Sequence, residues 1–448
     1  MPQHSYLYLI KLALPIILAN AAVPLLGLAD TAVIGQTGTT ADLGAIALAA
    51  LVFSFVYWGF GFLRMGTTGF VAQAVGAQDQ DELHALVFRT LFLGFAIGVV
   101  LIVLQKPIEL TATYFLHASP EVNALVRDYF YIRIWGAPAT LITFSLLGTL
   151  IGMGWTKQLL WVQLFLNGLN IALNVLFVVV FDLGVKGIAL GTVLAEWAAL
   201  FFALYWVFSK LQLRHPMQRY QALRPQVFRL DRLLALFQVN SDIMIRTLAL
   251  ITGFAWFARQ GAQFGDATLA ANHILLQFVS LSAFFLDGYA NVAEMLAGQA
   301  YGANNKERFQ HTVKRSTVLA GGTAFLLSLT VLLLGTTFIP FLSQDPHVQR
   351  IASDYKNLAA FYIFVSFAAF QLDGIFIGVT HSKPMRNSTV LALLVLVGLG
   401  SWWAPLYQNT GLWWALILYV IARAVVLAYY YPKILTHFTT STPLKASR

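Results

Sequence analysis

The sequence contains twelve apolar runs long enough to cross a lipid bilayer. A hydrocarbon core of ~30 Å is spanned by a helix of about 20 apolar residues. Backbone groups in lipid must be hydrogen-bonded within their own segment, so each run is predicted to be a helix. The runs occupy residues 7–34, 43–71, 86–105, 124–151, 158–181, 185–208, 231–258, 269–297, 315–339, 349–378, 388–407 and 411–432.

The composition supports the same fold class. Of 448 residues, 58% are hydrophobic and 10% are charged, whereas roughly a quarter are charged in a soluble domain. The absence of cysteine excludes disulfides, thiolate metal sites and cysteine nucleophiles. A net charge of +9 would suit a nucleic-acid partner only if the basic residues formed one face, but they are spread over the connections. We predict an all-α polytopic membrane protein that binds no nucleic acid.

Lysine and arginine concentrate in alternate connections. The connection after residue 208 carries six of them and the one after residue 297 carries four. The positive-inside rule assigns such connections to the cytoplasm, and both termini fall on the same side. We therefore expect a multi-pass protein of a bacterial cytoplasmic (inner) membrane with cytoplasmic termini, and membrane lipids with anionic headgroups as partners of the basic surplus.

The two halves of the chain match each other at one fixed offset. VAQAVGAQDQDEL, from Val71, aligns with AGQAYGANNKERF, from Ala297, at a separation of 226 residues. The same offset aligns Leu43 with Leu269, Arg89 with Arg315, Pro120 with Pro346, Gly148 with Gly374, and Gly152 with Gly378.

This repeat predicts a tandem duplication of a six-helix unit. The expected domains are an N-terminal lobe at 1–210, a basic linker at 211–230 and a C-terminal lobe at 231–448. Six spans per copy give both lobes the same orientation, so a pseudo-two-fold axis along the membrane normal should relate them.

One aspartate interrupts the first run, in the stretch LLGLADTAVIG at 25–35. A charge at the bilayer centre costs roughly 2.5–3.5 kcal/mol and usually has a transport role. Asp30 has no counter-charge within one helical turn, and such a carboxylate binds a proton more readily than one in water. Two interpretations stay open: a proton site, or a structural group that pairs with Arg64 or caps a helix.

Polar residues of other runs are predicted to surround this aspartate. Asn170 and Asn174 are four residues apart and so share one helix face. With Thr192 and Tyr131 they form a candidate cation-coupling cluster around Asp30. The alternative is that they only hydrogen-bond neighbouring helices to each other.

Two prolines in the first run define a candidate hinge. Pro15 and Pro24 each remove a backbone hydrogen bond and can kink a helix. Membrane helices also tolerate proline for structural reasons alone, so both interpretations stay open.

The second half has its own charged residues. Asp242 and Arg246 are four apart and are predicted to neutralise each other. Asp287 and Asp373 each lie in an LDG tripeptide without a local counter-charge. With Arg246 and Glu294 they form a possible substrate or second ion site, and the alternative is a structural group around Arg246.

Two further features occupy corresponding places in both halves. Small residues four apart, at 148–152 and 374–378, predict close helix packing. Glu196 and Arg423 lie in the last run of each half, where we expect contacts between lobes or with headgroups.

Four stretches resemble the multidrug and toxic compound extrusion (MATE) transporters, and in particular their DinF branch. These are LADTAVIGQ at 28–36, FLRMGTTGFVAQAVGA at 62–77, LDGYANVAEMLAGQAYGA at 286–303 and LDGIFIGVTHSKPMRNS at 372–388. The resemblance covers nearly the whole chain. It implies a proton- or sodium-driven exporter of organic, often cationic, compounds.

The resemblance also implies roles for individual residues. It places the family's cation-coupling aspartate at Asp30 and matches Asn170 and Thr192, with Tyr131 matched less closely. Asn174 departs from the pattern, because related sequences often have a second carboxylate there. A sodium site prefers several oxygen ligands and negative charge, so this departure favours a proton as the coupling ion.

We predict a monomeric secondary exporter that exchanges protons for organic cations by alternating access. It needs no cofactor besides H+, with Na+ as the alternative ion. A second alternative is a flippase for lipid-linked oligosaccharides, which would need a cationic cleft. An enzyme is disfavoured because the sequence has no HExxH, GxSxG or GxxxxGK[ST] motif.

Overall fold

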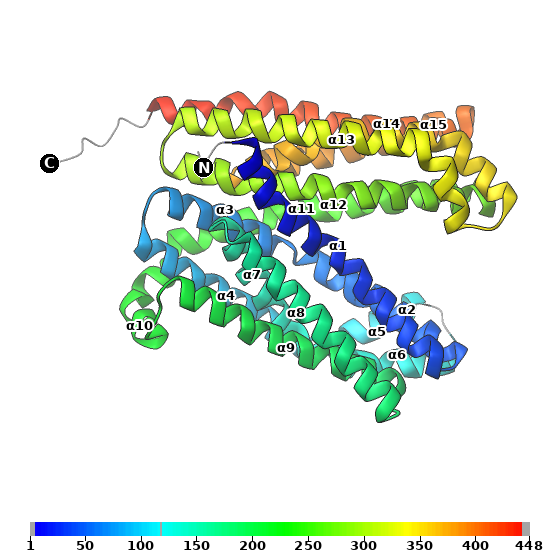
Figure 1. The fold of residues 1–448 in the computed structure, drawn as a ribbon, viewed down its shortest axis with the longest axis horizontal. Coiled ribbons are helices and arrows are strands. Elements are labelled where there is room, and N and C mark those ends of the chain that lie inside the picture. The colour runs from blue at the N-terminus through cyan, green and yellow to red at the C-terminus, as the bar shows by residue number, and fades with distance from the viewer. Residues whose placement is uncertain (1–4, 117–118, 441–448) are drawn as a thin grey trace. The chain divides into compact units, whose positions relative to one another are not determined.

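The computed structural model describes residues 5–116 and 119–440, and the regular elements within them are helical (Figure 1). The first half comprises α1 (Tyr6–Thr37), α2 (Thr40–Gly59), α3 (Phe62–Gly76), α4 (Gln80–Val103), α5 (Gln105–Leu116), α6 (Pro120–Arg133), η1 (Ile134–Gly136), α7 (Ala137–Gly152), α8 (Thr156–Val175), η2 (Leu176–Val180), α9 (Gly184–Lys210) and α10 (Pro216–Val227). The second half comprises α11 (Leu230–Ala262), α12 (Asp266–Gly302), α13 (Lys306–Leu342), α14 (Pro346–Gly378) and α15 (Ser382–Thr440).

The prediction of a twelve-helix membrane protein is confirmed. In the described part of the chain, ten helical stretches are long and apolar enough to cross a membrane, and α1 adds a shorter apolar stretch, Tyr6–Ala22. The backbone of α15 leaves helical geometry at Gln408, where φ is 50° and ψ is −135°. That break falls between the predicted runs 388–407 and 411–432, so α15 consists of the last two helices.

Two helices of the structure were not predicted. α5 lies in the connection between two spans, and α10 lies in the segment expected to be a basic linker. Proline occupies the first turn of α10, where its missing N–H costs nothing. Neither helix has an apolar run of spanning length, which is the feature on which the prediction depended.

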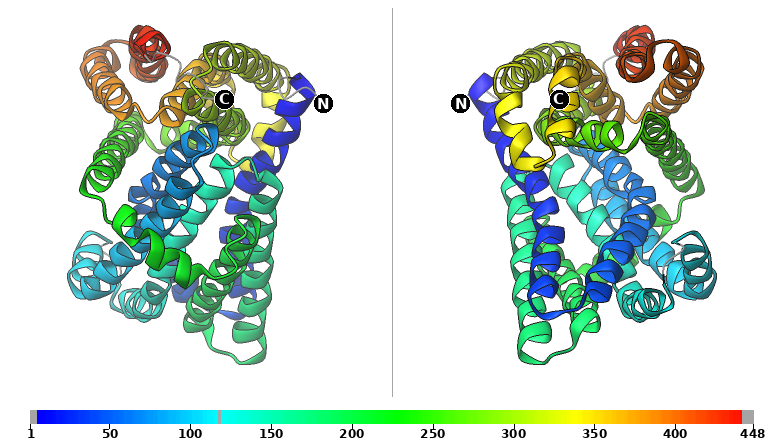
Figure 2. Two further views of the ribbon diagram at one scale, coloured as in Figure 1. Left: turned by 90° about the vertical axis from the view of Figure 1, so that its left-hand side faces the viewer. Right: turned by 90° about the vertical axis from the view of Figure 1, so that its right-hand side faces the viewer.

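The chain forms two compact units. The C-terminal unit contains residues 1–17, 72–78 and 237–448, and the N-terminal unit contains residues 18–71 and 79–236. The predicted N-terminal lobe therefore contributes two segments to the C-terminal unit, namely the start of α1 and the end of α3. In the C-terminal unit, α14 packs against α12, α13 and α15 (Figures 1 and 2).

Glycines bring α7 close to α3 within the N-terminal unit. A Cβ atom on Gly148 would lie 2.4 Å from the carbonyl oxygen of Arg64. A Cβ atom on Gly152 would lie 2.8 Å from the carbonyl oxygen of Thr68. Only glycine permits such an approach of two backbones, so the predicted close packing is confirmed here.

The C-terminal unit repeats this contact between α14 and α12. A Cβ atom on Gly374 would lie 2.3 Å from the Ala290 carbonyl oxygen, and one on Gly378 would lie 2.2 Å from that of Glu294. All four residues are the N-terminal ones shifted by 226 positions. The duplication is therefore visible in the packing as well as in the sequence.

The two copies of the repeated QAxGA motif meet each other within the C-terminal unit. A Cβ atom on Gly76 would lie 2.0 Å from the carbonyl oxygen of Gln299, and one on Gly302 would lie 2.1 Å from that of Gln73. The contact is reciprocal, since Gln73 and Gln299 are equivalent in the repeat. The Gln73 amide also donates to the Gly378 carbonyl oxygen at 3.0 Å.

This packing predicts that Gly302→Ala destabilises the protein, because the new methyl group would overlap the Gln73 carbonyl. Overpacking of this kind typically costs about 1–3 kcal/mol. Gly168→Ala is the matched control, because nothing lies within 4 Å of a Cβ atom at Gly168. Thermal unfolding of both variants in detergent should show a lower Tm for Gly302→Ala alone, and equal Tm values would contradict the packing argument.

Candidate functional site

Side chains of α1, α8 and α9 meet at Asp30 in the N-terminal unit. Asn174 Nδ2 donates to Asp30 Oδ1 at 2.6 Å and to Asn170 Oδ1 at 2.9 Å. Asn170 Nδ2 in turn donates to Thr192 Oγ1 at 2.9 Å. The structure therefore brings four of the five predicted cluster residues into one chain of hydrogen bonds.

Burial differs along this chain. The side chains of Asn170 and Asn174 are fully buried and Thr192 is 5% exposed, whereas Asp30 is half-buried. The Thr192 hydroxyl donates to the Ile188 carbonyl at 2.8 Å, which fixes the buried end of the chain to the α9 backbone. Asp30 is thus the member of the cluster that a proton or a ligand can reach.

Gly191 contributes to the site, although no pattern in the sequence indicated it. A Cβ atom there would lie 2.3 Å from Asn174 Oδ1, so the Asn174 side chain occupies space that any other residue at this position would fill. Helical periodicity could not reveal this contact, because Gly191 and Asn174 belong to different helices.

Helix α8 also holds α1 below the aspartate. Asn167 Nδ2 donates to the Ala22 carbonyl oxygen at 3.0 Å, so α8 contacts α1 at two levels, through Asn167 and through Asn174.

Of the candidate hinge residues, Pro15 is buried in the C-terminal unit, and the side chain of Pro24 lies outside the described residues. The hinge stays a prediction.

A buried ion pair lies in the same unit. Arg133 on α6 contacts Glu196 on α9 through two hydrogen bonds, of 2.6 and 2.5 Å. Their exposures are 7% and 8%, and the guanidinium lies over the rings of Phe53 and Tyr57. Arg133 is also within electrostatic reach of Asp30.

Arg133 was not among the predicted site residues. The expectation that Glu196 contacts the other lobe or headgroups was wrong, because this carboxylate lies against a guanidinium inside the unit. The available signal was the presence of opposite charges in the runs 124–151 and 185–208.

Tyr131 belongs to a different group, at α5 and α6. Its hydroxyl donates to Glu109 Oε2 at 3.4 Å, and Glu109 also accepts from Lys106 at 3.2 Å and Arg127 at 3.1 Å. Burial opposes ionisation of the Glu109 carboxyl, but hydrogen bonds from Lys106 and Arg127 hold its pKa below the usual value. The structure thus places Tyr131 beside a stable ion-pair network.

In the C-terminal unit, one carboxylate faces two guanidinium groups. Asp373 Oδ2 accepts from Arg246 Nη2 at 2.5 Å and also from Arg423 Nη2. All three residues are less than 9% exposed. The predicted partnership of Asp373 with Arg246 is confirmed as a contact, whereas Arg423 was expected between lobes or at headgroups and is instead buried in this group.

The predicted pair of Asp242 and Arg246 is wrong. Asp242 accepts from Arg386 Nη1 and from Ser382 Oγ, both at 2.7 Å. A pair four residues apart on a helix contributes only about 0.2–0.5 kcal/mol, so contacts from other helices displace it.

The other two predicted residues of this half, Asp287 and Glu294, lie on α12. Asp287 is half-buried and Glu294 is 2% exposed. Their role in substrate or ion binding stays a prediction.

A family model described as MatE matches residues 15–176 and 244–402. The DNA damage-inducible protein F of Escherichia coli (strain K12) is 36% identical over 93% of this chain and 90% of its own length. The probable multidrug resistance protein NorM of Thermotoga maritima is 24% identical over 86% of this chain and 82% of its own length.

Solved structures have the same fold. A crystal structure of MATE in the bent conformation superposes with a TM-score of 0.86 at 18% identity, covering 96% of both chains. An outward-facing multidrug resistance MATE family transporter of the MOP superfamily gives 0.83 at 17% identity, covering 97% of this chain and 96% of its own. The chain therefore belongs to the MatE family, as a multi-pass membrane transporter of the DinF type and not an enzyme.

Proposed function

We propose that the protein is a multidrug exporter that exchanges protons for organic, mostly cationic compounds by alternating access. Relatives named as multidrug resistance proteins support the substrate class. The observation that carries the coupling mechanism is the surroundings of Asp30, a half-buried carboxylate whose hydrogen bond comes from a neutral amide.

Four other buried carboxylates of the described chain have a guanidinium partner. Glu109, Glu196, Asp242 and Asp373 each contact such a group at 2.5–3.1 Å. Removing such a charge would leave a cation without its partner in a low-dielectric interior. Asp30 takes part in no ion pair of the described residues, so it can gain and lose a proton without that penalty.

Competition at one carboxylate then produces antiport. The ionised carboxylate of Asp30 attracts an organic cation, whereas the protonated form does not. Protonation also removes the charge-assisted character of the hydrogen bond from Asn174 to Asp30. The contact between α8 and α1 at Asp30 is then weaker. Proton entry thereby favours drug release and a change in the position of α1.

The alternatives are less well supported. Sodium prefers several oxygen ligands with negative charge, yet the cluster has a single carboxylate, and Asn170 Oδ1 already accepts the amide of Asn174. Similarity to proteins named for drug resistance favours drug export over flipping of lipid-linked oligosaccharides.

The proposal predicts that Asp30→Asn abolishes export while the protein still folds, because the amide has a similar shape but does not titrate. Drug resistance of pump-deficient cells should fall to that of cells without the protein, at matched expression. Asp128→Asn is the control, because Asp128 lies in the same unit but pairs with Lys186 at 3.3 Å. Full resistance in cells expressing Asp30→Asn would refute the coupling role.

A second prediction concerns the coupling ion. Efflux from vesicles by the parent protein should be driven by a proton gradient without sodium and should stop on addition of a protonophore. Asn174→Asp places a second carboxylate beside Asp30, so the variant should either require sodium or retain its proton and export more slowly. Efflux measured against pH, with and without sodium, checks both proteins. Sodium-driven efflux by the parent that is insensitive to pH would disprove proton coupling.

We further propose a structural role for Asp373, because two guanidinium groups share its carboxylate. Asp373→Asn should lower the stability by about 3–5 kcal/mol, since it leaves two buried cations without a counter-charge. Arg423→Gln should cost less, because the pair of Asp373 with Arg246 remains. Denaturation of both variants in detergent gives the comparison; wild-type stability of Asp373→Asn together with lost drug binding would instead indicate a ligand site.

A further inference from the structure

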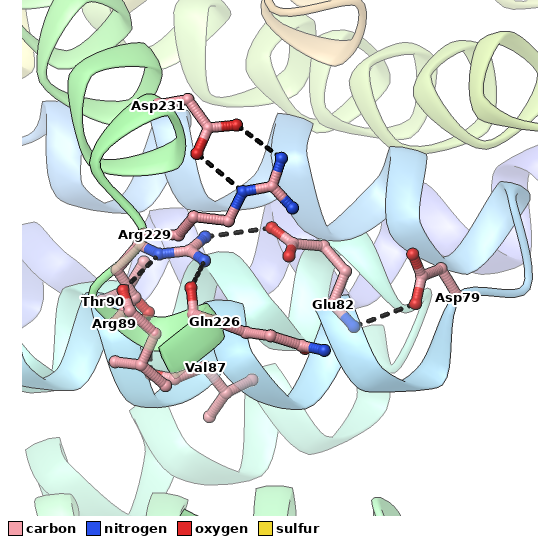
Figure 3. A network of polar contacts seen from close by, with 9 residues as sticks. Asp79, Glu82, Val87, Arg89, Thr90, Gln226, Arg229 and Asp231 are labelled. Atoms are coloured by element: carbon pink, nitrogen blue, oxygen red, sulfur yellow. Dashed lines mark hydrogen bonds and ion pairs between the residues drawn. The ribbon is translucent and has the colours of Figure 1, made fainter. Parts of the chain in front are cut away.

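Helix α10, in the connection between the two repeats, is fixed to α4 by Arg89 (Figure 3). Arg89 Nε donates to the Val227 carbonyl at 3.0 Å and Nη2 donates to the Gln226 carbonyl at 2.8 Å, while Nη1 pairs with Glu82 at 3.0 Å. A guanidinium therefore satisfies carbonyl groups at the C-terminal end of α10, where the helix dipole favours a cation.

One face of α10 is apolar and packs against α4. Leu223 is 4% exposed and Val227 is fully buried, and both cluster with Ala85. At the edge of this face, Arg219 pairs with Asp81 at 2.5 Å and donates to His84 Nδ1 at 3.1 Å. Arg89 and Arg219 thus have intramolecular partners, and they hold α10 in one orientation.

The opposite face of α10 has a different composition. Met217, Gln221 and Arg224 follow one another at helical spacing and are all exposed. Lys210 and Arg214, which precede the helix, are exposed as well. In the part of the chain that the structure describes, the side chains of Lys210, Arg214 and Arg224 make no hydrogen bond or ion pair.

The position of α10 in the chain indicates what its basic face can contact. α10 connects the ends of α9 and α11, both of which are candidate membrane spans. Two apolar side chains near the basic ones in the sequence are exposed, Met217 by 67% and Phe228 by 39%. Basic residues combined with exposed apolar residues are typical of helices that lie in the interface of anionic membranes.

We propose that the outward face of α10 binds anionic phospholipids of the cytoplasmic leaflet. Lys210, Arg214 and Arg224 pair with the lipid phosphates, and Met217 and Phe228 lie against the upper acyl chains. The charge is complementary to such headgroups, and the exposed apolar side chains favour a lipid over a soluble acidic partner. This inference goes beyond the proposed export function and does not depend on Asp30.

The test uses the full-length protein in detergent, with phosphatidylglycerol added in increasing amounts and bound lipid counted by native mass spectrometry. The variant that combines Lys210→Gln, Arg214→Gln and Arg224→Gln should require roughly a hundredfold more lipid for the same occupancy, because each basic residue near anionic headgroups contributes about 1 kcal/mol. The matched control combines Lys186→Gln, Arg259→Gln and Arg350→Gln, three exposed basic residues outside the basic connections, and should bind as the parent does.

Three results would overturn the proposal. The α10 variant could bind phosphatidylglycerol as tightly as the parent does. The control variant could lose as much binding, which would indicate a general charge effect. Glycerol phosphate could displace the lipid at equal concentration, which would show a site for soluble phosphate. Arg224→Glu alone, which leaves the contacts of α10 with α4 intact, should weaken binding in the same direction.

Discussion

The cost of a buried charge is the constraint on which the chemistry of this protein depends. In a low-dielectric interior an ionised group needs a close partner, and Glu196, Asp242 and Asp373 each have a guanidinium. Asp30 is held by an amide and is only half-buried. That difference is the basis of the proposal that Asp30 is protonated repeatedly, whereas the paired carboxylates hold helices together.

The same close backbone contacts at glycines occur in both halves and position the residues described above. α7 approaches α3 at Gly148 and Gly152, and α14 approaches α12 at Gly374 and Gly378. Because these contacts involve backbone atoms, they place few demands on the surrounding side chains. The N-terminal unit has accordingly gathered amides and a hydroxyl around Asp30, whereas the C-terminal unit has gathered arginines around Asp373.

The sequence was sufficient for features that follow one-dimensional patterns. Spanning helices follow from apolar length, the duplication from a constant offset, and the shared face of Asn170 and Asn174 from helical spacing. The partner of Glu196 was not predicted, because Arg133 is 63 residues away in the sequence and the two meet only in the folded chain. Helix α10 was missed because it gains its stability from packing against α4 and from Arg89 rather than from an apolar run.

The reciprocal contact of the QAxGA motifs bears on the origin of the two-repeat architecture. Gly76 lies on Gln299 and Gly302 lies on Gln73, so the same patch from each repeat meets its counterpart. Such a contact is isologous, as at the interface of a homodimer with two-fold symmetry. This local contact therefore has the symmetry expected when one self-complementary patch is duplicated within a single chain.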